Sequence, residues 1–174
     1  MVIRTERLIL RPWRVADAEE LFEFASDPQI GPAAGWPPHR SVGESREAIL
    51  GVLSAPETYA ICLKESGRLV GCICLKEPNP FIGSAGENDL EVGYWVGRAY
   101  WGLGFAPEAL RALVAHAFGE LGCPVLWCGH YGGNEKSRRC MEKCGFVYAE
   151  THHDVPRPLL GDTATERFYR LARP

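Results

Sequence analysis

The chain has 174 residues, of which 46% are hydrophobic and 24% are charged. This length and composition are typical of one globular domain that buries a core without disulfides. Its formal net charge of −3 provides no overall attraction for nucleic acid. The charged N-terminal segment does not resemble a signal peptide, and no apolar run reaches membrane-spanning length. We therefore expect one cytoplasmic domain, residues 1–174, that binds neither nucleic acid nor membranes.

The cysteines number seven, an odd count, and most of them lie within predicted elements rather than in loops. Cys72 and Cys74 share one face of a predicted strand, whereas Cys140 and Cys144 share one face of a predicted helix. No C-x-x-C pair occurs, which argues against a zinc ribbon or a thioredoxin-like motif. We expect reduced thiols that are mostly buried as small hydrophobic side chains.

Hydrophobic periodicity and turn residues predict alternating helices and strands. Strands are expected at residues 7–12, 59–64, 69–76, 89–96, 125–129, 146–150 and 166–171. Helices are expected from residue 17, from 41 to about 54, from 105 to 121 and from 135 to 144. Asp17 with Glu20, and Ser41 with Glu44, have the spacing of a capping box. The segment 31–39 is rich in glycine and proline and is predicted as an irregular loop.

The most informative segment is a glycine-rich turn at residues 101–106, between a predicted strand and a helix. Gly102 and Gly104 allow a sharp bend and a close approach to a ligand. Pro107 suits the first turn of a helix, where its missing N–H would have no partner anyway. The backbone N–H groups of residues 102–106 are therefore available to bind an anion such as pyrophosphate.

Three known anion-binding loops do not fit this turn. A P-loop requires a lysine that is missing here. A dinucleotide fingerprint requires a third glycine, and Pro107 stands in its place. The letters GLGF also occur in the carboxylate-binding loop of PDZ modules, but that loop leads into a strand, whereas the residues after Phe105 are helical.

The turn resembles the acetyl-CoA pyrophosphate loop of the GNAT superfamily of N-acetyltransferases, written Gln/Arg-x-x-Gly-x-Gly/Ala. Gly104 and Ala106 match its last two defined positions. A second block, N-E-K-S-x-x-x-x-E-K-x-G-F at residues 134–146, is similar to the signature of the RimJ/RimL-like branch, which acetylates protein N-termini. The segments DLEVGYWV and TERLILRPWRVADAEELFE resemble the same branch, so the resemblance covers nearly the whole chain.

The resemblance implies an α/β (α+β) fold with a mixed, mostly antiparallel central sheet flanked by helices. It also implies direct attack of a primary amine on the thioester of acetyl-CoA in a ternary complex, with acetyl-CoA as co-substrate and no metal. By resemblance, the free edge of Trp95 and Val96 pairs with the pantetheine arm, and a nearby N–H polarises the thioester carbonyl. The expected pyrophosphate contacts are Gly102, Leu103, Gly104, Phe105 and Ala106.

Proton transfer is also required, because most alkylamines have a pKa of about 10 and are protonated at neutral pH. Glu91 shares a strand face with Gly93 and is our candidate general base, or the residue that orients the water acting as one. The alternative is a solvated carboxylate at the open end of the strand. Many family members protonate the thiolate with a tyrosine, but Met141 stands at that position. Ser137 is the candidate to reach the CoA sulfur or pantetheine, and Asn134 is expected to cap the short helix and contact the cofactor.

Other residues depart from the family or remain open. Trp101 stands where the family has Gln or Arg, so a side-chain contribution to phosphate binding is not expected from it. Three basic residues share a face of the short helix and are expected to be mostly solvated, with cofactor phosphates as the alternative: Lys136, Arg139 and Lys143. His152 and His153 lack a third ligand, which favours a surface pair over a metal site.

The acceptor amine is expected between the segment 31–39 and the region 152–164. Trp36 is a candidate substrate-binding wall there, or else closes over the core. The resemblance favours a protein or peptide N-terminus, and small amines, including aminoglycoside-like antibiotics, remain open. Two other functions also remain: a non-catalytic acyl-CoA-binding protein, suggested by Met141 and Trp101, and an enzyme with a cysteine nucleophile. A homodimer is compatible with the sequence.

Overall fold

One eight-stranded sheet runs through the protein in the order β1-β2-β3-β4-β5-β6-β8-β7. We describe it from a computed structural model that covers all residues, 1–174. The strands are β1 (Ile3–Arg4), β2 (Leu8–Pro12), β3 (Thr58–Leu63), β4 (Leu69–Lys76), β5 (Leu90–Val96), β6 (Val125–Tyr131), β7 (Val147–Arg157) and β8 (Asp162–Ala172). All neighbouring strands are antiparallel except β5 and β6, which are parallel. The expected mixed, mostly antiparallel sheet is confirmed.

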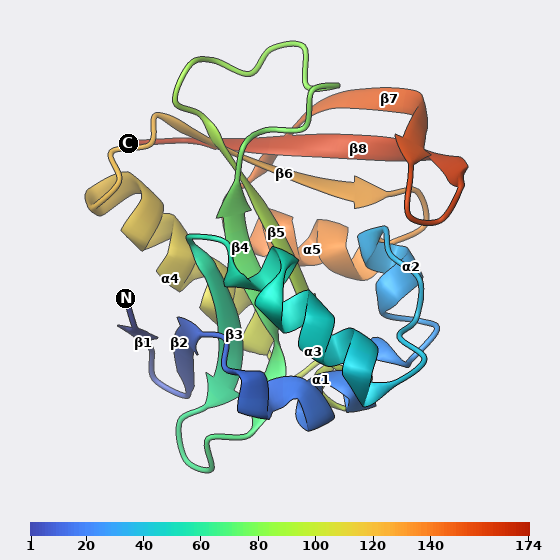
Figure 1. Ribbon diagram of the computed structural model, residues 1–174. Helices are drawn as coiled ribbons and strands as arrows, with labels where there is room; N and C mark the ends of the chain where they lie inside the picture. Colours follow the sequence, from blue (N-terminus) through green and yellow to red (C-terminus); the bar gives the residue numbers. More distant parts are fainter.

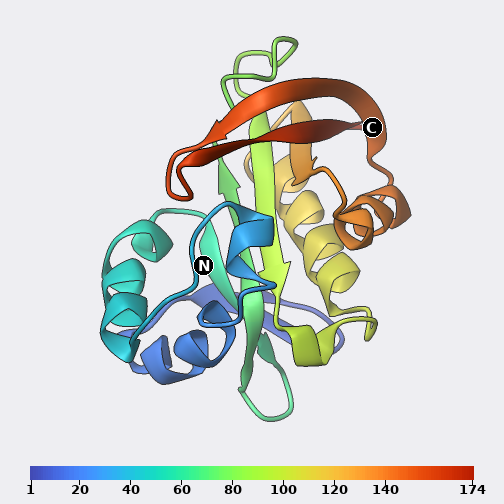
Figure 2. The ribbon, with the colours of Figure 1, turned by 90° about the vertical axis from the view of Figure 1, so that its right-hand side faces the viewer.

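Helices cover both faces of this sheet (Figures 1 and 2). One face carries α1 (Ala18–Ala25), α2 (Gly31–Ala34) and α3 (Val42–Leu50), and the other carries α4 (Phe105–Gly119) and α5 (Glu135–Lys143). Short 3-10 turns lie at Val15–Asp17, Val52–Ser54 and Arg98–Tyr100. None of the helices combines the length and the hydrophobicity needed to cross a membrane.

The main core lies between the sheet and α4. Leu110 and Leu113, three residues apart on one face of this helix, are fully buried there against apolar residues of β2 to β6. The helix was expected to reach residue 121, but it ends at Gly119 and the Leu121 side chain is exposed. A second core cluster lies under α1 and α3 on the opposite face.

The predicted capping box of the first helix is wrong. Both carboxylate oxygens of Asp17 accept hydrogen bonds from the Arg11 guanidinium, at 2.8 Å each, and one also accepts from the Arg14 backbone N–H. Glu20 instead accepts a hydrogen bond from the backbone N–H of Leu69, at 2.7 Å. Asp17 therefore joins the start of the helix to β2, and Glu20 joins the helix to β4. Neither carboxylate caps the helix, because each binds a partner elsewhere in the fold.

Two segments are more regular than the sequence predicts. Residues 31–34 form the short helix α2, which contains a proline in its first turn and ends at Gly35 in the left-handed region, φ 92°. Strands β7 and β8 form a long hairpin that arches over one end of the sheet (Figure 2). The hairpin was predicted too short because the central residues of both strands are mostly polar and show no alternation.

Candidate active site

Strands β5 and β6 separate after a short parallel pairing. Their register comprises three pairs, the last of which is Val92 with Cys128. The next residue on each strand is a glycine, Gly93 and Gly129. Beyond this fork point β5 stays paired with β4, and β6 stays paired with β8. Two strand edges therefore face each other across a wedge in the middle of the sheet.

A cleft of about 780 Å³ occupies this wedge. Its walls are formed by α2, the ends of β5 and β6, the turn before α4, the first turns of α5, and Arg157 at the end of β7. Most of the site residues predicted from the sequence line it: Trp95, Val96, Gly102, Gly104, Phe105, Ala106, Asn134 and Ser137. Glu91, Leu103 and Trp36 are not among the lining residues.

The turn before α4 presents unpaired backbone amides to the cleft. Gly102 and Gly104 have φ values of 81° and 80°, a conformation that favours glycine. The first helical hydrogen bond runs from Glu108 N–H to the Gly104 carbonyl, so the N–H groups of Phe105 and Ala106 have no partner within the helix. The N–H of Leu103 is the exception in this turn, since it donates to the Tyr100 carbonyl at 3.4 Å.

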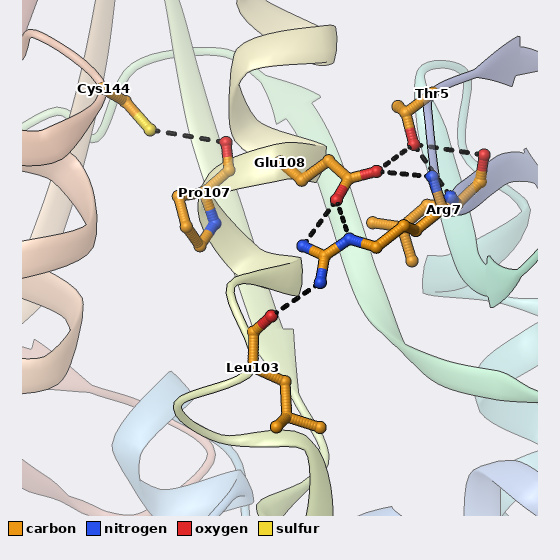
Figure 3. Close-up of polar contacts among 7 residues, drawn as sticks. Thr5, Arg7, Leu103, Pro107, Glu108 and Cys144 are labelled. Carbon is orange, nitrogen blue, oxygen red and sulfur yellow. Dashed lines mark hydrogen bonds and ion pairs between the residues drawn. The ribbon is translucent and has the colours of Figure 1, made fainter.

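Arg7 holds this turn from the N-terminal strand region (Figure 3). Its guanidinium donates to the Leu103 carbonyl at 2.9 Å and to the Glu108 carboxylate at 2.7 Å. It also lies over the Phe105 ring, 4.7 Å from the centroid. Glu108 in turn accepts from the Thr5 hydroxyl and from the Arg7 backbone N–H. With its outward carbonyl bound in this way, the turn keeps its free amides directed to the cleft side.

The Trp101 side chain lines the cleft and is bound to the end of β5. Its indole N–H donates to the Val96 carbonyl at 2.8 Å, which ties the turn to the end of β5. The Lys136 ammonium lies over the Trp101 ring at 3.5 Å from the centroid. A cation from α5 therefore stands beside the position where the family has Gln or Arg. Lys136 lines the cleft together with two further basic residues of α5, Arg139 and Lys143.

The first turn of α5 brings a hydroxyl group to the cleft. The Asn134 side chain accepts from the Ser137 backbone N–H at 3.2 Å, which confirms the predicted N-cap. The Tyr94 hydroxyl of β5 lies 3.0 Å from the Ser137 hydroxyl, and either group can donate this hydrogen bond. The Tyr94 hydroxyl is also placed to donate to the Ser137 carbonyl, at 3.2 Å. Met141 is fully buried in the main core. Tyr94, which the sequence analysis did not select, therefore supplies a phenol beside Ser137.

Comparison with known proteins identifies the family. Residues 7–147 match the family described as acetyltransferase (GNAT) domain. The chain belongs to this family. Over 122 residues it is 31% identical to the uncharacterized N-acetyltransferase p20 of Bacillus licheniformis, a match that covers 67% of this chain and 66% of that protein. The expected membership in the GNAT superfamily is thus confirmed, and the protein is an acyltransferase.

Solved GNAT structures share the whole architecture. A GNAT-family acetyltransferase from Bacillus anthracis superimposes with a TM-score of 0.87 at 23% identity, covering 99% of both chains. RimL, a ribosomal α-N-protein acetyltransferase in complex with coenzyme A, aligns with a TM-score of 0.81 at 18% identity, over 99% of this chain and 98% of that one. Acetyl-CoA is the acetyl donor of the family.

Two buried carboxylates of this acetyltransferase flank the fork point, on the sheet face that also carries α2. Glu91 is 4% exposed, pairs with the Lys76 ammonium at 3.0 Å and accepts from the Asn79 backbone N–H at 2.7 Å. Glu166 of β8 is 6% exposed. Burial, followed by the negative charge of Glu91, raises the pKa of Glu166 to about 7. No sequence pattern points to Glu166, because it lies in a polar stretch between Thr165 and Arg167.

The seven thiols are all free, and one lies at the cleft of the acetyltransferase. Burial raises the pKa of most of the others, such as Cys72 and Cys128. Cys140 differs, because a hydrogen bond with the Cys144 thiol and another with Tyr94 lower its pKa. No group of three or more His, Cys, Asp or Glu side chains is arranged to hold a metal.

The far end of the cleft is bounded by aromatic rings and by Arg157. The Arg157 guanidinium pairs with Asp162, donates to the Pro32 carbonyl of α2 at 3.2 Å, and lies 5.0 Å from the Tyr131 ring centroid. Trp36 packs against Trp95 with ring centroids 6.2 Å apart, within the second core cluster. Arg157 thus joins the hairpin to α2 at this end of the cleft, and Trp36 packs against Trp95, which is part of the cleft wall.

Proposed function

We propose that the protein transfers the acetyl group of acetyl-CoA directly to a primary amine, and that the acceptor is the N-terminus of a protein or peptide. The observation that carries this proposal is the wedge between β5 and β6, which ends at a turn of unpaired amides. An amide-containing arm can pair with a free strand edge, while amides at a helix N-terminus favour a pyrophosphate. Trp95 and Val96 belong to that edge, and Gly102, Gly104, Phe105 and Ala106 form the turn.

Electrostatics support a polyanionic cofactor at the same end. Lys136, Arg139 and Lys143 line the cleft near the turn, although the net charge of the chain is negative. We propose that Lys136, already placed over Trp101, contributes the positive charge that a Gln or Arg supplies in other family members. Asn134 joins the cofactor contacts from the start of α5.

The leaving thiolate requires a proton, and the Tyr94–Ser137 pair is suited to provide it. Burial keeps the pKa of Tyr94 above its usual range, so the phenol retains its proton at neutral pH. Its hydroxyl contacts Ser137, which lines the cleft on the α5 side. We propose that the proton passes from these hydroxyls to sulfur, in place of the tyrosine that Met141 replaces.

The ammonium of the acceptor must lose a proton on the opposite side of the fork. Glu91 stays our sequence-based candidate for the base or for the residue that orients a water. Glu91 lies one residue before the fork point, in the paired part of β5, and it does not line the cleft. A water between Glu91 and the amine is therefore part of this proposal.

The end of the cleft beside α2 and the β7–β8 hairpin is the proposed acceptor end. We propose that a protein or peptide N-terminus enters between α2 and the β7–β8 hairpin, where Tyr131 and Arg157 line the cleft. RimL, a ribosomal-protein acetyltransferase, shares this fold. Small amines and aminoglycoside-like antibiotics are the alternative acceptors, and the test below distinguishes them.

A cysteine nucleophile is the second candidate mechanism, because Cys140 lines the cleft with a lowered pKa. In this mechanism the acetyl group moves from CoA to the Cys140 sulfur and then to the amine. Direct attack predicts that Cys140→Ala retains acetyl transfer and that the kinetics require a ternary complex. Loss of activity in Cys140→Ala together with ping-pong kinetics supports the thiol route instead.

Cofactor binding is tested first by thermal unfolding with acetyl-CoA, with ATP and NAD as controls. At about 100 times its dissociation constant a ligand stabilises the native state by about 2.7 kcal/mol. We expect stabilisation by acetyl-CoA and CoA alone, and its loss in Gly104→Val, which introduces a branched side chain at a positive φ. No stabilisation by acetyl-CoA contradicts the proposed cofactor site.

Catalysis is tested by CoA release with hexapeptides that begin with Ser, Ala or Met, with spermidine and with kanamycin. We expect release with at least one peptide. Release with spermidine or kanamycin alone assigns the protein to small amines. Binding of acetyl-CoA without release from any of the amines indicates a non-catalytic acyl-CoA-binding protein.

A further inference from the structure

The fork point has a carboxylate directly above it, supplied by β8. A Cβ atom placed on Gly129 would come within 2.6 Å of a Glu166 carboxylate oxygen. Glu166 therefore occupies the space that a side chain at Gly129 would fill, where β6 leaves β5. In the β6–β8 register Glu166 lies opposite Tyr131, a residue that lines the cleft. The carboxylate is thus adjacent to the cleft floor and separated from solvent.

The two carboxylates at the fork differ in how they are bound. Both oxygens of Glu91 are engaged, one by Lys76 and the other by the Asn79 backbone N–H. Glu166 has a single hydrogen-bond partner, the Asn79 side-chain amide, at a long distance of 3.3 Å. A base needs a free lone pair directed to the proton. The Glu166 oxygen nearest Gly129 accepts no hydrogen bond from the protein, whereas each oxygen of Glu91 already has one partner.

Charged groups from every neighbouring strand face Glu166. Glu91 from β5 disfavours its ionised form, while Lys76 from β4 and His152 from β7 favour it. Tyr131 faces it from β6, and the Glu166 charge in turn raises the pKa of Tyr131 after burial does so. Burial, the largest cause, together with these charges raises the pKa of Glu166 to about 7, where a base works best near neutral pH.

We propose that Glu166 accepts the proton of the incoming ammonium group through one water, and that Glu91, held by Lys76, positions this proton-accepting site without itself taking the proton. This inference rests on the proposed acetyl transfer. It assigns proton removal to a residue of β8 and leaves Glu91 the electrostatic role.

The acceptor nitrogen loses two protons during the proposed transfer, one before and one after its attack. The ammonium gives one proton through the water to Glu166, and the nitrogen lone pair then forms a bond with the thioester carbonyl carbon. As the carbon–sulfur bond breaks, its electron pair stays on sulfur. The Tyr94–Ser137 pair gives one proton to the thiolate, and the second proton of the nitrogen passes to solvent, from which this pair is protonated again. Glu166 releases its proton to solvent when the products leave.

Two variants, Glu166→Gln and Glu91→Gln, separate these roles through their pH profiles. The probe is the amine with the fastest CoA release among the five tested above, at saturating acetyl-CoA. In the wild type we expect kcat to fall as the pH drops below the Glu166 pKa of about 7, which gives the profile an acid limb. Glu166→Gln should lower kcat by about 100-fold or more and abolish this limb. Glu91→Gln should retain the limb and shift it to lower pH, because a neighbouring negative charge is removed.

Controls exclude a merely structural effect. Both variants should keep the thermal stabilisation by acetyl-CoA. Glu166→Asp should restore part of the activity together with the limb. Glu142→Gln, which neutralises an exposed carboxylate of α5 outside the cleft, should leave the profile unchanged.

The outcomes that oppose the inference are distinct from those that oppose the proposed function. A limb that disappears in Glu91→Gln and only shifts in Glu166→Gln overturns the inference and makes Glu91 the base. Wild-type kinetics in Glu166→Gln overturn it as well. Absence of CoA release from every amine in the wild type overturns the proposed function, and this inference with it.

Discussion

The hydroxyl groups of Tyr94 and Ser137 come from different walls of the cleft and lie 3.0 Å apart. If they protonate the leaving thiolate, Tyr94→Phe should slow the chemical step by roughly 100-fold, the lower end of the range for a proton-transfer group. Acetyl-CoA binding should change little, because the ring remains. Single-turnover acetyl transfer measures this step separately from product release.

A second acyl donor tests whether the lost function is proton donation. A thiol whose pKa is much lower than that of CoA leaves as a thiolate without protonation. With the acetyl thioester of such a thiol, Tyr94→Phe should approach the wild-type rate. Ser137→Ala should respond in the same direction. An equal defect with both thioesters would mean that Tyr94 acts through packing alone.

Glu166 makes stability depend on pH in a predictable direction. Folding raises its pKa from the usual 4.5 to about 7, so between these values the unfolded chain ionises while the folded protein keeps the proton. The free energy of unfolding therefore falls as pH rises through this window, and above it the cost is on the order of 3 kcal/mol, at 1.36 kcal/mol per pKa unit. Glu166→Gln should remove this cost.

Urea unfolding of both proteins across this window measures the difference. We expect Glu166→Gln to be more stable than the wild type above about pH 7, with the advantage disappearing toward about pH 4.5. A stability difference that does not vary with pH would show that the carboxyl is not buried in the way described.

At the level of elements, the turn before α4 depends on a residue nearly a hundred positions earlier. Arg7 binds the Leu103 carbonyl and Glu108, so it fixes the turn that exposes the amides (Figure 3). Arg7→Ala should weaken acetyl-CoA about tenfold, equal to about 1.4 kcal/mol. The effect is moderate because the Arg7 side chain is 45% exposed and solvent screens the pair.

Titration calorimetry with acetyl-CoA measures this effect. Arg4→Ala is a matched control, since Arg4 is an exposed arginine of β1 in the same N-terminal region. Its affinity should equal that of the wild type. An equal loss in both variants would indicate a general contribution of positive charge rather than support of the turn.

Local patterns predicted the elements that local chemistry determines. The strand at residues 69–76 was located to the residue because its apolar run is bounded by a glycine turn and a charged loop. The turn before α4 was located for a similar reason, since two glycines and a proline fix its backbone. The hairpin β7–β8 was predicted too short, because its strands are held by pairing with each other and with β6 rather than by an apolar pattern.

The chemistry of the cleft was less accessible to the sequence. Tyr94 and Ser137 are 43 residues apart, and only the fold brings β5 to α5. Glu166 becomes notable because Gly129 leaves room for its carboxylate, which depends on the register of β6 with β8. Glu91 was correctly placed on the same strand face as Gly93, but its ion pair with Lys76 depends on the register of β4 with β5.

For the whole molecule, the proposed cofactor end and the proposed acceptor end of the cleft are built from different segments. Arg157 joins the β7–β8 hairpin to α2 at the acceptor end. Arg157→Ala should raise KM for the amine by roughly tenfold, equal to about 1.4 kcal/mol of lost binding, with acetyl-CoA affinity unchanged. Steady-state kinetics with each substrate varied in turn measures both values.

Asp162→Ala serves as the companion variant, because it removes the carboxylate that holds Arg157. It should affect the same parameter in the same direction, and the double variant should show less than the sum of the two effects. A change in acetyl-CoA affinity with an unaltered amine KM would contradict this division of the cleft.

The short seam between β5 and β6 has a consequence for the lifetime of the protein. Only three residue pairs join the two halves of the sheet, and acetyl-CoA between them would bridge the rest. Ligands that bind the folded state reduce the population of open forms that proteases attack. We expect digestion of the free protein to begin around this seam and to slow as acetyl-CoA is added. The amount of intact enzyme would then follow the supply of its own acetyl donor, so that scarcity of the metabolite removes the catalyst that consumes it.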